Sequence, residues 1–166
     1  MFINLRELAQ SGATFAIRGS LDAEDAASGR NDLSVESLID ASLTARYDAG
    51  TAVVAGELSA DLELVCSRCL RVVKDKASVP VAERFTLRQD IAERDDDIHL
   101  VKEEVVELDP YLREAFAVSL PLAAVCSETC KGLCPVCGKD RNADPCGCVQ
   151  ERIDPRLAGL KDFFQK

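Results

Sequence analysis

The chain has 166 residues, 47% of them hydrophobic, which is enough for one globular domain with its own core. No run approaches the roughly 20 apolar residues that span a bilayer, so we expect no membrane association. A net charge of −9 argues against a protein that coats nucleic acid, because proteins that bind along a phosphate backbone carry net positive charge.

The N-terminal region predicts two short strands, Phe2–Leu5 and Thr14–Arg18, separated by a break at Ser11-Gly12. The stretch Asp22–Asp32 is polar and contains glycine and asparagine. It is typical of a loop or a short frayed helix.

Three runs between residues 39 and 88 alternate apolar and polar side chains with a period of two, which marks half-buried strands. They cover 39–48, 57–64 and 79–88, and Asp48-Ala49-Gly50 supplies a turn between the first two. One face of such a sheet packs and the other meets water, which favours an antiparallel meander. The parity that buries Leu62 also turns Cys66 inward.

The segment Asp90–Asp97 is rich in carboxylates and is typical of a solvated loop. Asp109-Pro110 predicts a helix with Asp109 as its N-cap, and Pro121 ends this helix at the preceding residue. Asp154-Pro155 repeats the start signal. It predicts a C-terminal helix with an apolar stripe at helical spacing, formed by Leu157, Leu160 and Phe164.

All eight cysteines fall into closely spaced pairs, which is how a backbone delivers two thiolates at once to tetrahedral zinc. The pairs are Cys66 and Cys69, Cys126 and Cys130, Cys134 and Cys137, and Cys146 and Cys148. Four pairs predict two structural Zn²⁺ ions, each held by four cysteines. Three partitions are possible. The one we favour joins the last two pairs across a short loop and leaves the first two pairs to form a long-range site.

Other uses of the cysteines fit the sequence less well. The first residues contain no basic leader and no long apolar run, so we expect a cytoplasmic protein, where thiols stay reduced and disulfides are rare. The spacing lacks a ferredoxin-like run, and the flanking alternation does not supply the βαβ setting of a thioredoxin-type pair. Iron–sulfur and redox roles are thus alternatives to structural zinc.

The sequence predicts no enzyme. Catalytic zinc keeps an open position and commonly uses a histidine or a carboxylate, but the only histidine, His99, lies beside the acidic segment. No glycine-rich phosphate loop, nucleophile elbow or Ser-His-Asp constellation is present.

Together these patterns predict an α+β fold, with an antiparallel β-sheet meander, two short helices and a C-terminal zinc-binding subdomain. We expect residues 1–125 to form the sheet domain with one helix. Residues 126–166 are expected to form the cysteine-rich subdomain with the C-terminal helix.

Positive charge collects in the segments that hold the cysteines. Residues 66–89 carry six basic and two acidic side chains, and residues 131–166 carry seven and five. These groups either screen thiolate charge or contact nucleic acid. The candidate nucleic-acid contacts are Arg68, Arg71, Lys74, Lys76, Lys131, Lys139 and Arg141.

An ordered series of motifs runs from about residue 38 to the C-terminus. It contains Cys66-Ser-Arg-Cys69-Leu70, Glu107-Leu-Asp-Pro110, Leu120-Pro-Leu122, Cys126 to Gly138 with its three cysteine spacings, and Asp154-Pro-Arg-Leu-Ala158. This series resembles the YceD family, also called DUF177. The N-terminal third is similar only loosely.

The resemblance implies a role in the accumulation of large-subunit (23S) ribosomal RNA. We therefore expect a non-catalytic zinc-binding factor in large-subunit biogenesis that binds a ribosomal protein or an assembly intermediate. The acidic surface favours a basic protein partner, because like charge repels RNA and opposite charge speeds association. The alternative is a zinc-stabilised RNA-binding module that contacts rRNA through the local basic patches. The oligomeric state is left open.

Overall fold

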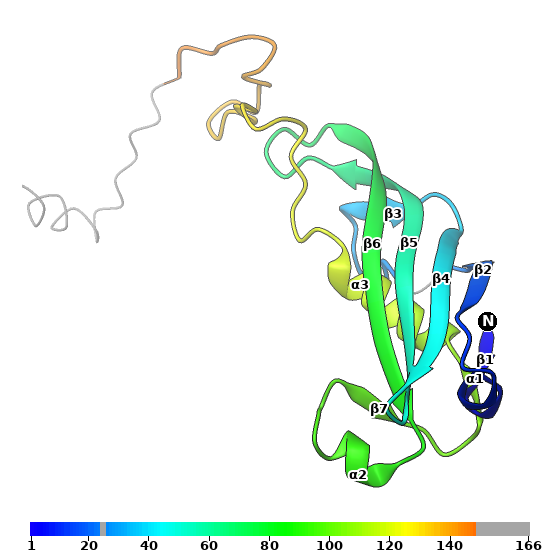
Figure 1. Cartoon of the computed structure of the whole chain (residues 1–166). Coiled ribbons are helices and arrows are strands. Elements are labelled where there is room, and N and C mark those ends of the chain that lie inside the picture. The colour runs from blue at the N-terminus through cyan, green and yellow to red at the C-terminus, as the bar shows by residue number, and fades with distance from the viewer. Residues whose placement is uncertain (24–25, 149–166) are drawn as a thin grey trace, which may run out of the picture.

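The computed structural model describes residues 1–23 and 26–148. Helices and mostly antiparallel strands confirm an α+β fold (Figure 1). The elements in chain order are β1 (Phe2–Asn4), α1 (Leu5–Ser11), β2 (Phe15–Leu21), β3 (Leu33–Val35), β4 (Ile39–Asp48), β5 (Thr51–Val65), β6 (Val72–Thr86), α2 (Gln89–Ala92), β7 (Ile98–Leu100), β8 (Val105–Glu107) and α3 (Asp109–Ser119).

The main sheet has the strand order β2-β4-β5-β6-β7, and β3 pairs with the C-terminal end of β5. Only β7 runs parallel to its neighbour, β6; β1 and β8 form a separate antiparallel pair. The predicted meander is thus present as β4-β5-β6. The β4–β5 turn also falls where the sequence places it, with Ala49 at φ 47° and Gly50 at φ 90°.

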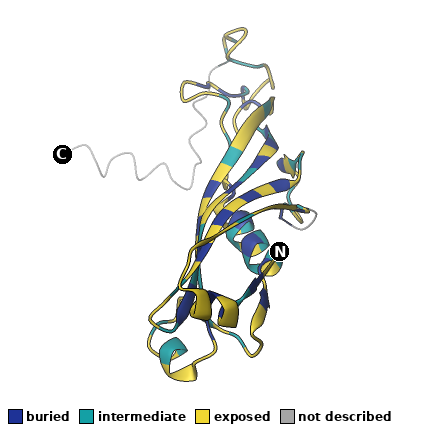
Figure 2. Ribbon diagram, turned by 45° about the vertical axis from the view of Figure 1, so that its right-hand side comes forward, coloured by how far each residue is buried: buried dark blue, intermediate teal, exposed yellow. Residues whose placement is uncertain are grey.

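The core lies between one face of the sheet and the helices α1 and α3 (Figure 2). Along β4 every second residue from Ile39 to Ala45 is buried, as the alternation predicts. Leu58 of β5, Phe85 of β6 and Phe116 of α3 are fully buried within this layer. Burial of such side chains contributes about 1.5–3 kcal/mol each relative to exposure.

The strands β5 and β6 are longer than the predicted runs, at 15 residues each. Alternation identifies a strand only where one of its faces is buried. The first half of β6 is exposed on nearly every residue, from Val72 to Ser78, so it carries no such signal. The paired strands nevertheless continue to Val65 and Val72, where the sheet meets the cysteine-containing turn.

The predicted strand Phe2–Leu5 is wrong at its last residue, because Leu5 begins α1. The side chain of Asn4 accepts hydrogen bonds from the backbone N–H groups of Arg6 and Glu7, which is the usual chemistry of an N-cap. Gly12 ends the helix in a left-handed conformation, at φ 60°.

The helix α3 begins one residue earlier than predicted, so Asp109 lies in its first turn and Leu108 holds the N-cap position. The Asp109 carboxylate instead forms an ion pair with the N-terminal ammonium of Met1, which links the residue before β1 to the start of α3. The helix stops at Ser119, before Pro121, as expected. The segment Asp90–Asp97 is partly helical, since α2 covers its start.

The C-terminal helix predicted from Asp154-Pro155 lies outside the described residues. Among the helices that are described, none has the length and apolar character needed to cross a membrane.

Gly56 allows an unusually close approach of β4 and β5. A Cβ atom at this position would lie 2.7 Å from Leu43 Cα and even closer to the carbonyl oxygen of Ser42. Because both contacts are backbone atoms, we expect Gly56→Ala to lower the free energy of unfolding by about 2 kcal/mol or more, measured by urea denaturation. Ser59→Ala on the outer face of the same strand should change it by less than about 0.5 kcal/mol. Equal effects would contradict this packing.

Candidate metal centre

The first cysteine pair forms the turn of the β5–β6 hairpin. Val65 and Val72 are the last paired residues of the two strands. Beyond them the Cys66 N–H donates to the carbonyl of Arg71 at 2.9 Å, and the Leu70 N–H donates to the carbonyl of Cys66 at 2.9 Å. The sheet therefore continues without interruption into the turn that presents both sulfurs.

The third pair repeats the same turn. The Cys134 N–H donates to the Lys139 carbonyl at 2.8 Å, and the Gly138 N–H donates to the Cys134 carbonyl at 2.8 Å. The residue after the second cysteine is left-handed in both turns, with Gly138 at φ 73° and Leu70 at φ 58°. Glycine is the usual residue in this conformation, so the sequence signal is clear at Gly138 and absent at Leu70.

The structure brings the eight cysteines together as two groups of four. One contains Cys66, Cys69, Cys126 and Cys130, and the other contains Cys134, Cys137, Cys146 and Cys148. Within each group the sulfur atoms all lie within 4.8 Å of one another. This is the partition that the sequence favours, and it is confirmed.

The sulfur spacing of the first group suits a shared metal ion. Cys66 Sγ and Cys130 Sγ are 3.9 Å apart, and Cys69 Sγ and Cys126 Sγ are 3.6 Å apart. Four sulfurs at about 2.3 Å from a tetrahedral zinc ion would be about 3.8 Å apart, whereas a disulfide bond needs about 2.0 Å. None of the eight cysteines, all of which lie in the described part of the chain, forms a disulfide bond.

Contacts of the backbone bring Cys126 to the distant hairpin turn. Cys66 and Ala124 form a parallel β-bridge, and the Ser67 N–H and Oγ both donate to the Ala124 carbonyl, at 2.8 and 3.0 Å. The Cys126 N–H then donates to Cys66 Sγ at 3.3 Å. The Arg68 guanidinium completes the link, because it donates to the carbonyls of Glu128 and Cys130 at 3.1 Å each.

Backbone N–H groups stabilise one thiolate in each group. Those of Cys126 and Cys69 lower the pKa of Cys66 to about 6. Those of Cys137 and Val136 likewise lower the pKa of Cys134 to about 6. Both groups therefore contain a sulfur that is ionised at neutral pH before any metal binds.

Other sulfurs of the same groups are held in the protonated form. Hydrogen bonding with Cys130 and Cys69 raises the pKa of Cys126 to about 12, and Cys137 does the same for Cys148, also to about 12. Four adjacent sulfurs cannot all ionise unless a cation offsets their charge. Each group is thus able to hold a metal ion, and a set of four sulfur donors suits zinc.

His99 takes no part in either group. Its Nε2 atom lies 2.8 Å from the Glu83 carboxylate, and its ring stacks on Phe85 and meets Tyr111. These contacts place it at the β7 side of the sheet, away from the cysteines (Figure 1).

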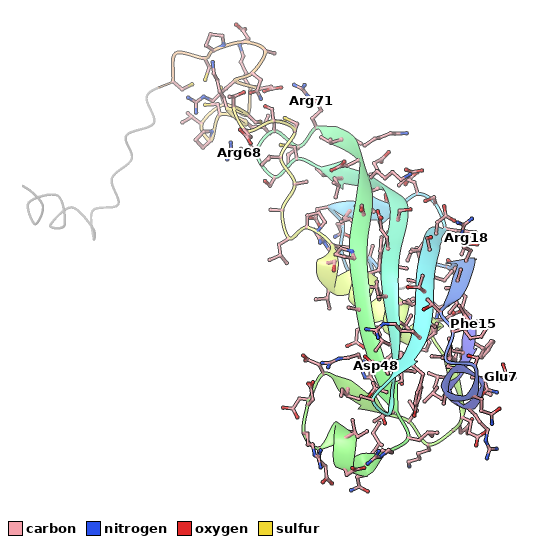
Figure 3. The ribbon with its side chains drawn as sticks, viewed as in Figure 1. Glu7, Phe15, Arg18, Asp48, Arg68 and Arg71 are labelled. Carbon is pink, nitrogen blue, oxygen red and sulfur yellow. The ribbon has the colours of Figure 1, made fainter. Side chains whose placement is uncertain are left out.

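Two of the candidate nucleic-acid contacts on the hairpin, Arg68 and Arg71, have partners within the protein. Arg68 and Arg71 both lie at the cysteine end of the sheet (Figure 3). Arg68 binds the two carbonyls described above, and Arg71 forms an ion pair with Asp140 at 3.0 Å. Lys74 and Lys76 of β6 are exposed and lie opposite Glu63 and Asp61 of β5, respectively.

Of the remaining basic candidates, Lys139 and Arg141 lie on the loop of the second cysteine group, and Lys131 lies in the short segment that joins the two groups. Lys131 and Lys139 are exposed, and Arg141 is half-buried.

Sequence reasoning missed two residues that join the groups, Asp140 and Asn142. The Asn142 side chain donates from Nδ2 to Cys130 Sγ at 3.4 Å and to Asp140 Oδ1 at 2.7 Å. An asparagine in a loop is common, so its spacing from Cys130 gave no signal.

Residues 54–164, which include all eight cysteines, match the family described as large ribosomal RNA subunit accumulation protein YceD. The chain belongs to the YceD family. No solved structure matches the chain.

Several relatives in this family are bacterial. An uncharacterized protein of Mycobacterium tuberculosis is 32% identical over 130 residues, which cover 76% of this chain and 62% of the relative. The uncharacterized protein YlbN of Bacillus subtilis is 29% identical over 110 residues, covering 66% and 64%. The chain thus spans less than two thirds of the length of these relatives.

A plant relative carries a functional name. The chloroplastic large ribosomal RNA subunit accumulation protein YCED homolog 1 of Zea mays is 30% identical over 93 residues. The match covers 55% of this chain and 31% of the maize protein.

Metal analysis of the purified YceD-family chain tests the two groups directly. We expect two zinc ions per chain, and Cys134→Ser should lower the content to about one while far-UV circular dichroism shows the sheet intact, because the first group uses none of the ligands of the second. Ser127→Ala, between two ligands of the first group, should retain both ions. A fully folded wild-type chain without metal would contradict the assignment.

Proposed function

We propose that the protein is a non-catalytic zinc-binding factor in biogenesis of the large ribosomal subunit. In this proposal each four-cysteine group holds one structural Zn²⁺ ion, and the protein supports 23S rRNA accumulation by binding a ribosomal protein or an assembly intermediate. One observation carries the proposal. The residues that match the family, 54–164, include all eight cysteines of the two groups, and the family is named for large-subunit rRNA accumulation.

Four observations support a structural rather than a catalytic metal. Each group supplies four thiols, which closes a tetrahedral shell and leaves no position for substrate. Three sulfurs of the first group, Cys66, Cys69 and Cys130, are buried. Backbone N–H groups already bind Cys66, and Asn142 binds Cys130. His99, the one histidine of the chain, is engaged with Glu83.

The charge distribution supports a basic protein as the partner. Residues 89–104 carry seven acidic and two basic side chains, and they form α2, β7 and the adjoining loops, at the opposite end of the hairpin from the cysteines (Figure 1). Asp96 and Glu103 are exposed there. An acidic surface of this kind attracts a basic extension and repels phosphate.

The alternative function is direct contact with rRNA, and Lys131 and Lys139 favour it because they are exposed, beside and on the loop of the second group. Arg68 and Arg71 favour it less, since both are already bound within the protein. A cytoplasmic location belongs to the proposal as well, because a reducing compartment keeps the thiols available for metal.

A depletion experiment tests the cellular role. In cells that carry the gene, loss of the protein should lower the ratio of large-subunit to small-subunit rRNA, measured by capillary electrophoresis of total RNA. Wild-type protein and the Ser127→Ala variant should restore this ratio. Cys66→Ser should not, because it removes a metal ligand at the junction with the sheet. An unchanged ratio after depletion would overturn the proposed function.

Capture of partners from lysate separates the protein and RNA hypotheses. The combined change Asp96→Asn and Glu103→Gln should reduce recovery of a basic ribosomal protein several-fold, whereas Lys131→Ala with Lys139→Ala should leave it unchanged. In the same eluate, mass spectrometry measures the captured proteins and RNA sequencing measures the captured RNA. Recovery of rRNA that falls steeply between about 50 and 200 mM salt, and that depends on the two lysines, would favour the RNA module instead.

A further inference from the structure

The loop of the second cysteine group lies against the turn of the first. The Leu133 N–H donates to the Arg68 carbonyl at 2.9 Å, and Arg71 pairs with Asp140 at 3.0 Å. Gly132 fits closely at this contact, because a Cβ atom there would lie 2.7 Å from the Arg68 carbonyl oxygen. The two groups are therefore in direct mechanical contact through residues that are not ligands.

Asn142 makes the most direct of these connections. Its Nδ2 atom has two hydrogens, and it uses them to donate to Asp140 Oδ1 at 2.7 Å and to Cys130 Sγ at 3.4 Å. Its Oδ1 atom accepts from the Lys131 N–H at 2.8 Å, which fixes the orientation of the amide. A residue from the loop of one group thus supplies a hydrogen bond to a sulfur ligand of the other.

A hydrogen bond of this kind affects the metal as well as the sulfur. It draws negative charge from the thiolate and fixes the direction in which its lone pairs point. Removing such an outer partner commonly changes metal affinity by about 10–100-fold. Asn142 is accordingly a positioning residue for the first group, because it acts on a bound metal only through Cys130.

The position of Asn142 depends in turn on the second group. It lies between Cys137 and Cys146, so a metal held by the second group would close the loop that carries it. Within this loop, Arg141 N–H donates to the Gly132 carbonyl at 3.0 Å, and Leu133 and Asp140 form one isolated β-bridge. These residues are buried or half-buried, but they belong to loops and not to a helix or a sheet, and loop contacts open more readily than those of a core.

We propose that Asn142 couples the two four-cysteine groups, so that metal in the second group tightens the binding of metal in the first and thereby slows its release. The inference rests on the proposed function, since it requires that both groups bind metal. By thermodynamic linkage, a first group loaded with metal favours an ordered loop and tighter binding in the second. The chain therefore loads and loses its two ions as a coupled pair.

Release of zinc to a chromogenic chelator, followed in the full-length loaded chain, tests the coupling. At intervals, free thiols are alkylated, and mass spectrometry identifies which cysteines have lost metal. Asn142→Ala should speed release from the first group by about 10-fold or more. Asp144→Ala, a truncation of similar size at an exposed residue of the same loop, should leave that rate unchanged.

A double variant separates coupling from two independent effects. Cys134→Ser should speed release from the first group, and adding Asn142→Ala should speed it no further, because both changes break the same connection. If the two changes multiply their effects on the release rate of the first group, or if Asn142→Ala releases that metal at the wild-type rate, the coupling is overturned while the proposed metal sites stand. A wild-type chain that binds fewer than two ions would overturn the proposed metal sites and the coupling with them. Thermal unfolding followed by circular dichroism verifies that each variant is folded.

Discussion

The structure depends on the position of Cys66, which belongs at once to the sheet and to a four-sulfur group. Its N–H continues the β5–β6 pairing, and its backbone forms the bridge to Ala124. Its sulfur accepts from Cys126 N–H and meets Cys130. The register of the sheet therefore fixes where the first group forms. The described loops after α3 are joined to the sheet at Cys66 and at the residues of its turn.

The second constraint is electrostatic. Each group places four sulfurs within 4.8 Å of one another, and backbone N–H groups lower the pKa of Cys66 and Cys134, whereas the adjacent sulfurs raise the pKa of Cys126 and Cys148. A divalent cation bound to such a group would offset the charge. Its binding would then contribute to folding, because the unfolded chain holds no such arrangement of thiolates. The described loops after residue 125 contain no strand or helix of their own, which leaves the cysteines as their main source of order.

Much of this follows from the sequence. The alternation of Ile39 to Ala45 predicts β4, and cysteine spacing predicts the two groups because a short loop between pairs favours local closure. The zinc identity stays a prediction. The start of β6 lacks a signal, since most of its residues are exposed and only Val73 and Ala77 are half-buried. The helix α1 was missed because its cues, Asn4 and Gly12, are single residues beside a short apolar run. Asn142 was missed because its role arises only when two loops meet.

The length of the hairpin sets the distance over which the protein is able to act. A strand of 15 residues extends about 50 Å at roughly 3.3 Å per residue, with the cysteine turn at one tip and the carboxylate-rich loops near the other. A small protein domain is only about 30 Å across. One such domain bound at either tip would leave the opposite tip uncovered. The β5–β6 hairpin is thus long enough for two small domains to bind at its two ends without contacting each other.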